Sequence, residues 1–127
     1  MKSWICLALI LLPLFSVVEG HQFGSPRLMK IDEETIVMAK FAIAEHNRQA
    51  KKNLVYVNVV QETMQIVAGV LYRLIIAAKN GRGAVINHEA FVWDKLDSSR
   101  TLVSFRECMP AAYVKRFTTD VCTPVGN

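Results

Sequence analysis

The fold of this chain is decided by residues 54–78, which read LVYVNVVQETMQIVAGVLYRLIIAA. Val and Tyr dominate the run from Leu54 to Val60, where Asn58 is the one polar interruption, and this composition predicts a β-strand. A second apolar run, Val70 to Ala78, predicts another strand. Gln65 to Gly69 breaks the pattern between them, so we expect two sequential strands joined by a loop.

Two further strands are expected after this pair. The second strand ends at the turn Asn80-Gly81-Arg82-Gly83. The run from Ala84 to Trp93 then alternates between two faces. One face would carry Val85, Asn87, Glu89, Phe91 and Trp93, and the other Ile86, His88, Ala90 and Val92. A polar loop, Asp94 to Arg100, separates this strand from the last one, Thr101 to Glu107.

A helix is expected before the strands. Asp32 is a good N-cap, and acidic residues follow it in the first turn, where they complement the helix dipole. The helix should stop between Asn47 and Lys51. Its expected apolar face consists of Ile36, Ala39 and Ile43 at helical spacing, flanked by Val37, Phe41 and Ala44. Residues 21–31 show no periodicity and predict an extended, mobile N-terminal arm.

These elements predict an α+β architecture. Four strands in a meander give an antiparallel sheet with one apolar face, and the helix is the one element large enough to cover that face. Residues 108–127 carry no comparable pattern, so we expect a loosely structured tail.

The first 20 residues have the composition of a secretory signal peptide. Lys2 provides a positive start, the stretch from Trp4 to Val18 is almost wholly apolar, and a cut after Gly20 fits the small-residue rule. A retained membrane helix is the alternative, but the stretch is short for a span and Pro13 interrupts it. We therefore expect a protein that is secreted to the extracellular space or the vacuole, without a membrane anchor after processing.

Charge and cysteine usage agree with export. The net charge is +4, and the basic residues are scattered without interleaved aromatic side chains, which argues against a nucleic-acid partner. Removing the leader takes away Cys6 and leaves Cys108 and Cys122 as an even pair. Two thiols in an oxidising compartment favour a disulfide that holds the tail. A nucleophilic cysteine is the alternative, but no histidine signature accompanies either residue.

No catalytic, metal or cofactor motif is found in the sequence. The pair His88-Glu89 lacks a second histidine at metal spacing, and no Cys-x-x-Cys occurs. His46 precedes the expected helix end, where a packing or capping role is usual. The glycines at 81 and 83 belong to a hairpin turn rather than to a phosphate-binding loop. The sequence therefore favours a binding protein without cofactors over an enzyme.

The run Gln65-Ile66-Val67-Ala68-Gly69 is the most unusual feature. A hairpin loop lies at the end of a sheet and faces solvent, and exposed apolar residues there are costly unless a partner covers them. The alternative is that Ile66 and Val67 continue the strands and that Gly69 is a bulge. The residue pattern leaves both interpretations open.

Two motifs in the expected order resemble the cystatins. Gln65 to Gly69 matches their Gln-x-Val-x-Gly loop, and Val37 to Asn47 (VMAKFAIAEHN) closely follows the helix signature of plant cystatins. Ala90 to Leu96 resembles the run that leads into the second binding hairpin of the family. The resemblance implies a cystatin-like α+β fold, with a four-to-five-stranded antiparallel sheet wrapped around one N-terminal helix. The resulting domain division is a leader over 1–20, a cystatin domain over 21–107 and a tail over 108–127.

The resemblance also implies a function, the reversible and tight inhibition of papain-like cysteine proteases, either endogenous or from pests and pathogens in defence. Cystatins insert three segments as a wedge into the protease cleft. In this chain the corresponding positions are Gly24, the loop residues Gln65, Ile66, Val67, Ala68 and Gly69, and the turn residues Leu96 and Asp97. We expect no catalytic residue, metal or cofactor, and a monomer, with a domain-swapped dimer as the alternative.

Two positions depart from the family pattern. The second hairpin of cystatins usually carries Pro-Trp, where this chain has Leu96-Asp97, and Trp93 is expected to pack on the sheet rather than to replace the missing aromatic residue. The arm has one glycine, Gly24, where plant relatives often have two adjacent ones. These changes predict a weaker or more selective inhibitor. The alternative function is a cystatin-fold binding or storage protein whose inhibitory activity is reduced or lost.

Overall fold

A computed structural model describes residues 24–110 and 121–125. It contains one helix and five strands in the order β1, α2, β2, β3, β4, β5. Their bounds are β1 Arg27–Met29, α2 Glu33–Ala50, β2 Val55–Val67, β3 Gly69–Lys79, β4 Val85–Asp94 and β5 Arg100–Glu107. The leader expected over 1–20 and most of the expected tail lie outside the described residues. Within the described part of the chain, no helix combines the length and apolar character needed to cross a membrane.

Helix α2 is closed at both ends by local hydrogen bonds. The Asp32 side chain accepts from the Thr35 amide at 3.0 Å, and the Asp32 amide donates back to the Thr35 hydroxyl at 3.2 Å. At the other end Lys51 adopts a left-handed conformation. The Asn47 side chain both donates to and accepts from the backbone of Leu54. These bonds confirm the predicted helix ends and fix the entry into β2.

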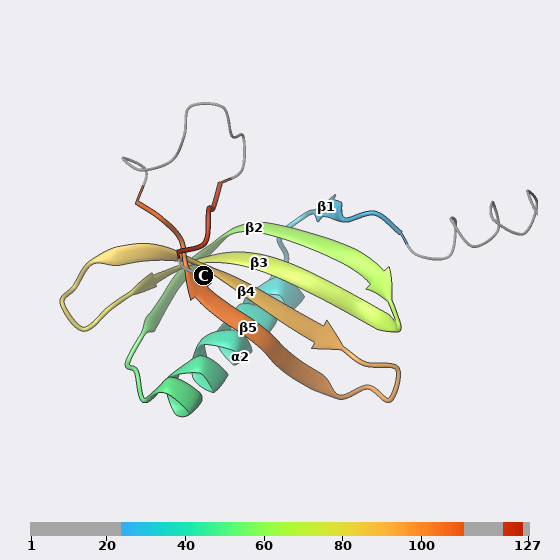
Figure 1. The fold of residues 1–127 in the computed structure, drawn as a ribbon, viewed down its shortest axis with the longest axis horizontal. Coiled ribbons are helices and arrows are strands. Elements are labelled where there is room, and N and C mark those ends of the chain that lie inside the picture. Colours follow the sequence, from blue (N-terminus) through green and yellow to red (C-terminus); the bar gives the residue numbers. More distant parts are fainter. Residues whose placement is uncertain (1–23, 111–120, 126–127) are drawn as a thin grey trace, which may run out of the picture.

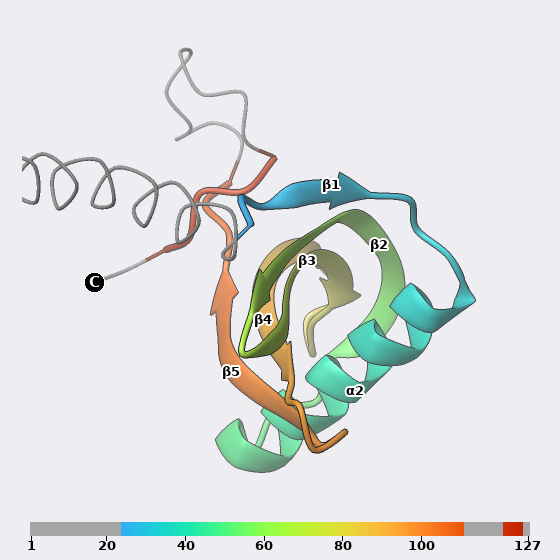
Figure 2. The same cartoon turned by 90° about the vertical axis from the view of Figure 1, so that its right-hand side faces the viewer.

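The strands form one antiparallel sheet in sequence order, β1-β2-β3-β4-β5. The sheet curves around α2, which crosses its concave face (Figures 1 and 2). Register shifts leave Val57 and Val60 without a partner in β3, and such bulges bend a strand and increase its twist. The predicted α+β fold, with the helix covering one face of an antiparallel sheet, is therefore confirmed.

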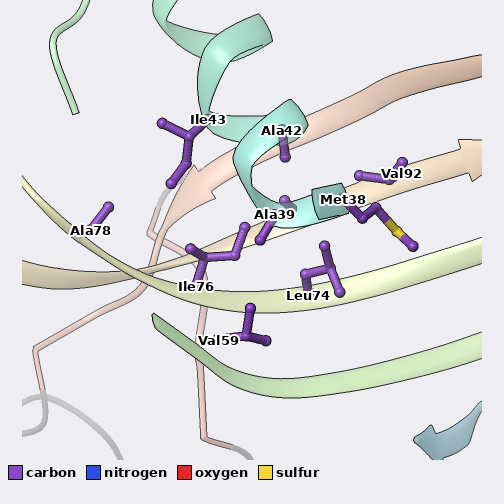
Figure 3. Close-up of a cluster of buried hydrophobic side chains, with 10 residues drawn as sticks. Met38, Ala39, Ala42, Ile43, Val59, Leu74, Ile76, Ala78 and Val92 are labelled. Carbon is purple, nitrogen blue, oxygen red and sulfur yellow. The ribbon is translucent and has the colours of Figure 1, made fainter. Parts of the chain in front are cut away.

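The hydrophobic core lies between α2 and the concave face of the sheet (Figure 3). The helix contributes Met38, Ala39, Ala42 and Ile43, and the sheet contributes Val59, Leu74, Ile76, Ala78, Ala90 and Val92. The prediction that Val37 and Ala44 flank this face is wrong: Val37 is 56% exposed and Ala44 is exposed. The buried stripe is centred on Met38, Ala39 and Ala42 instead, because the helix turns that side toward the core residues of the sheet.

The structure corrects two predictions about strands. The arm over 21–31 was expected to be extended and mobile, but Arg27–Met29 forms the edge strand β1, paired with Glu62 to Met64 of β2. Extended backbone next to an open sheet edge gains hydrogen bonds by pairing with it. Because this gain depends on the backbone, the pattern of side chains does not predict it. Strand β2 also continues to Val67, beyond the break expected at Gln65.

The convex face of the sheet carries the disulfide and a small charge cluster. Cys108 and Cys122 are bonded, which is the pairing expected from the sequence, and both pack against Ile75 in a second buried cluster. Arg73 and Arg106 both bind the buried carboxylate of Glu89, at 2.6 and 3.1 Å. The disulfide thus anchors the segment around Cys122 on the side of the sheet away from the helix.

Candidate functional site

Three segments meet at one end of the sheet: the N-terminal arm, the β2–β3 hairpin and the β4–β5 hairpin (Figures 1 and 2). In an antiparallel meander every second hairpin lies at the same end, which places these two hairpins together. Arg27 pairs with Met64, so the chain before β1 runs toward the β2–β3 tip. The fold therefore brings the arm and both hairpins into one row, which we call the hairpin edge.

The β2–β3 hairpin turns over a single unpaired residue. Ile66 pairs with Val70 and Val67 pairs with Gly69, which leaves Ala68 at the tip. The five-residue loop predicted over Gln65 to Gly69 is thus wrong in length, and the alternative, in which Ile66 and Val67 continue the strand, is closer to the structure. Ile66 is nevertheless 47% exposed and Ala68 is exposed. The tip therefore presents small apolar groups to solvent.

Position 69 requires glycine for two reasons, its backbone conformation and the close approach of a neighbouring strand. Its φ of +99° lies in a region that L side chains rarely adopt. A Cβ at this position would also collide with the carbonyl oxygen of Asp94 at the end of β4. The two hairpins are therefore in backbone contact, and only glycine permits it.

Trp93 connects the same two hairpins through its side chain. Its indole Nε1 donates a hydrogen bond of 2.8 Å to the carbonyl oxygen of Ala68. Lys95 Nζ lies 5.3 Å from the centre of the indole ring. Sequence reasoning treated Trp93 as a residue packed on the sheet and did not anticipate this bond. The sequence offers no signal for this bond, because it depends on the strand register that places Trp93 opposite Leu71 near the hairpin tip.

The β4–β5 hairpin is a tight turn with one very exposed apolar residue. The Asp97 carboxylate accepts from the Ser99 amide at 2.9 Å and from its hydroxyl at 2.6 Å, and these bonds lower the pKa of Asp97. Leu96 is 81% exposed at the tip. At the base of the turn, Arg100 binds the Asp94 carboxylate and reaches Glu34 at the start of α2, at 3.3 Å. This ion pair links the base of the turn to the start of the helix.

Gly24 begins the described part of the arm. It is half-buried, and a Cβ built on it would meet no atom within 4 Å. The free protein therefore does not require glycine at this position for packing. A role of Gly24 in binding stays a prediction from the resemblance.

The chemistry of the hairpin edge suits binding rather than bond making. Its prominent groups are Ile66, Ala68 and Leu96, all apolar. Within 24–110 and 121–125, no three His, Cys, Asp or Glu side chains are grouped so that they could hold a metal ion. A convex row of small apolar side chains on fixed hairpins can enter a groove of a partner and exclude water from it.

His46 and His88 lie outside the hairpin edge and serve packing. His46 stacks on Phe105 with 4.1 Å between ring centres, and His88 lies 5.2 Å from the same ring. Burial lowers the pKa of both imidazoles. Together with Lys52 and Glu107 they line a hollow of about 300 Å³. The packing role expected for His46 agrees with this arrangement.

Comparison with known proteins gives a family of aspartic protease inhibitors and several plant cysteine protease inhibitors. A family profile described as "Aspartic acid proteinase inhibitor" matches residues 29–108. Cysteine proteinase inhibitor 1 of Actinidia chinensis var. chinensis is 52% identical over 71 residues, which cover 55% of this chain and 60% of that protein. Cysteine proteinase inhibitor 5 of Arabidopsis thaliana is 35% identical over 92 residues, covering 72% and 75%. The cysteine proteinase inhibitor of Hordeum vulgare is 40% identical over 96 residues, covering 76% and 87%.

Proposed function

Because this chain belongs to the plant cystatins, a family of cysteine proteinase inhibitors, we propose that it is a reversible, tight-binding competitive inhibitor of papain-like cysteine proteases. The hairpin edge is the proposed binding surface. The observation that carries the proposal is the alignment of the arm before β1, the β2–β3 tip and the β4–β5 turn along one end of a single sheet.

The mechanism follows from the shape and chemistry of this edge. The tip residues Ile66, Val67 and Ala68 would enter the active-site cleft and fill it without offering a scissile bond to the catalytic thiol. Inhibition is then exclusion of substrate, and it is reversible because no covalent bond forms. The arm from Gly24 would lie along the substrate groove beside the tip, and the β4–β5 turn would contact the opposite side.

Rigidity of the edge supports tight binding. Compact apolar side chains such as Ile66 and Ala68 lose little conformational entropy when they are covered. The contact of Gly69 with Asp94 and the bonds of Arg100 hold both hairpins before any partner arrives. A preordered surface lowers the ordering cost of association, so more of the contact energy appears as affinity.

The proposal is tested by placing a charge on the tip. Val67→Asp would bring an unpaired carboxylate into the apolar contact, and we expect papain inhibition to be lost while the far-ultraviolet circular dichroism stays unchanged. Val57→Asp is the matched control, because Val57 is an exposed valine near the other end of the same strand. Equal inhibition of papain by the Val67→Asp variant and the wild-type protein would refute the proposed surface.

A second candidate function is inhibition of an aspartic protease. The description of the family profile that matches residues 29–108 favours it. The same titration series should therefore include pepsin beside papain. Inhibition of pepsin alone would replace the first proposal by the second, and inhibition of neither enzyme would support the binding or storage role that the Leu96-Asp97 departure suggests.

We also propose that the protein acts in a secretory compartment. The bonded pair Cys108–Cys122 supports this location, because disulfides persist in oxidising compartments and are rare in the cytosol. Expression of the full chain with a C-terminal fluorescent tag tests it. A tag found in the apoplast or the vacuole is expected, and a diffuse cytosolic signal would contradict the proposal.

A further inference from the structure

We propose that Trp93 is a positioning residue for inhibition, which holds the tip of the β2–β3 hairpin in its binding conformation through the hydrogen bond from its indole to Ala68. This inference rests on the proposed function. It concerns the hairpin tip and its support rather than a further contact segment.

The tip needs a support because Ala68 has no partner in the sheet. The residues on either side of it, Val67 and Gly69, pair with each other, so the ladder ends one residue short of Ala68. A carbonyl group at such a tip could rotate and would accept hydrogen bonds from water. The Trp93 Nε1, at 2.8 Å, gives that carbonyl one fixed direction.

The bond joins two residues that are not register partners in the sheet. Trp93 lies on β4, and the tip belongs to β2 and β3, so the indole extends past the register partner Leu71 to reach Ala68. The backbone contact between Gly69 and Asp94 lies beside it. Two adjacent contacts therefore prevent the tip from moving independently of the β4–β5 hairpin.

The support continues to the helix. Arg100 binds the Asp94 carboxylate at 2.6 and 3.1 Å and contacts Glu34 in the first turn of α2. The path from Ala68 through Trp93, Asp94 and Arg100 thus ends on the most regular element of the fold. A tip held in this way is ordered before it meets a protease.

The position of the bond distinguishes a functional from a merely stabilising role. The bond between Trp93 and Ala68 is exposed to solvent, where a hydrogen bond contributes little net stability. Its loss should therefore affect the order of the tip more than the stability of the fold. Inhibition depends on that order, so the effect should appear in binding.

The test compares Trp93→Phe with Asn80→Ala. Phenylalanine keeps an aromatic ring but removes the N–H donor. Asn80→Ala removes a comparable side chain to backbone support in the β3–β4 hairpin, where Asn80 Oδ1 accepts from the amides of Arg82 and Ala84 at the other end of the sheet. Inhibition constants and dissociation rates are measured against papain, and melting temperatures by circular dichroism.

We expect Trp93→Phe to weaken inhibition about three- to tenfold, a factor that corresponds to the loss of one net hydrogen bond. The weaker inhibition should arise chiefly from faster dissociation. Asn80→Ala should leave the inhibition constant within about twofold of the wild-type value. The two variants should have similar melting temperatures. Equal inhibition by Trp93→Phe and wild type overturns the inference alone. An equal loss in both variants also overturns it, because general destabilisation then explains the effect.

An independent measurement separates this inference from the proposed function. In ¹⁵N-labelled protein the indole N–H of Trp93, assigned by its absence in Trp93→Phe, should exchange with solvent more slowly than a free indole, and rapid exchange would overturn the inference. If the wild-type chain inhibits no papain-like protease, the proposed function fails and this inference with it, even where the indole N–H is protected.

Discussion

The Thr35 hydroxyl of α2 lies 3.0 Å from the Glu62 carboxylate of β2, in the interior between helix and sheet. Thr35 is 1% exposed and Glu62 is 5% exposed. The same hydroxyl lies 2.9 Å from Asp32 Oδ1, and its single proton cannot be donated to both carboxylates. A protonated Glu62 would resolve this conflict by donating to Thr35. In agreement, burial and the nearby charge of Asp32 raise the pKa of Glu62, against the opposing effect of the Thr35 bond.

Glu62→Gln should not destabilise the protein at neutral pH. The folded pKa of Glu62 lies above the ordinary 4.5, so its contribution to stability is complete below pH 4.5 and is lost as the pH rises through the folded pKa. The neutral amide avoids that loss. Urea unfolding at pH 7 should give a free energy equal to the wild-type value or up to about 1 kcal/mol above it. Glu33→Gln, at an exposed position in the first turn of α2, is the control. A decrease of more than about 1 kcal/mol in Glu62→Gln alone would contradict the prediction.

Acid should weaken the packing of His88. Burial lowers the pKa of His88 below the ordinary 6.5, although Glu107 opposes the shift, and the nearby Lys52 and His46 add no negative charge. The unfolded chain then takes up the proton first as the pH falls, so this contribution to stability is complete above about pH 6.5 and declines below it. Glu62 has the opposite pH dependence of stability. Its effect cancels when wild type is compared with His88→Leu, because both proteins contain Glu62. The stability difference should move by about 1 kcal/mol in favour of the variant between pH 7 and pH 5. A constant difference would show that His88 does not titrate in this range.

Gly69→Ala should destabilise the chain strongly. The substitution forces a side chain into a φ of +99° and against the Asp94 carbonyl, so we expect a loss of about 2 kcal/mol or more in the free energy of unfolding. Gly81→Ala is the matched control, because its Cβ would meet no atom within 4 Å. It should change stability by less than about 0.5 kcal/mol. Similar values for both variants would show that the two hairpins are not in the contact described.

Removing the disulfide should reduce stability without reducing inhibition. The bond closes a loop with a sequence separation of 14 residues, for which chain entropy predicts about 3 kcal/mol. Cys108 follows the C-terminal end of β5, whereas the β4–β5 turn of the hairpin edge precedes that strand. The double variant Cys108→Ser, Cys122→Ser should therefore melt at a lower temperature, and its inhibition constant, measured well below that temperature, should stay within about twofold of wild type. A tenfold weaker inhibition would show that the disulfide shapes the binding surface.

Leu96→Trp should strengthen inhibition. Leu96 is 81% exposed, so a larger side chain displaces no packing, and Asp97 can keep its turn bonds to Ser99. An indole at the centre of an interface often contributes 2 kcal/mol or more, and we expect the inhibition constant to fall about tenfold. Leu96→Ala is the control for the loss of the leucine itself and should weaken inhibition slightly. An unchanged constant in Leu96→Trp would place the second hairpin outside the interface.

Local sequence signals were sufficient for the helix and for most strand positions. Asp32 and Thr35 begin α2 through bonds within four residues, and Lys51 ends it one residue after Ala50. The alternation from Val85 to Trp93 identified the faces of β4, because side chains in a strand point to opposite sides in turn. Such features depend on neighbours in the chain, and the sequence contains those neighbours.

Contacts between distant segments could not be predicted in the same way. The pairing of β1 with β2 depends on an open sheet edge, and the exposure of Val37 depends on how the helix is rotated against the sheet. The bond from Trp93 to Ala68 depends on the register of three strands at once. A shift of any one of them would remove it while leaving every local pattern unchanged.

The sequence by itself determined the helix, the order of the last four strands, the cysteine pair and the resemblance to cystatins, since each rests on residue type and spacing along the chain. Only the tertiary structure decided how the hairpin edge is supported. Gly69 against Asp94 and Trp93 on Ala68 join residues that are 25 positions apart in the chain. These contacts exist because the curvature and register of the sheet bring the two hairpins together at one end.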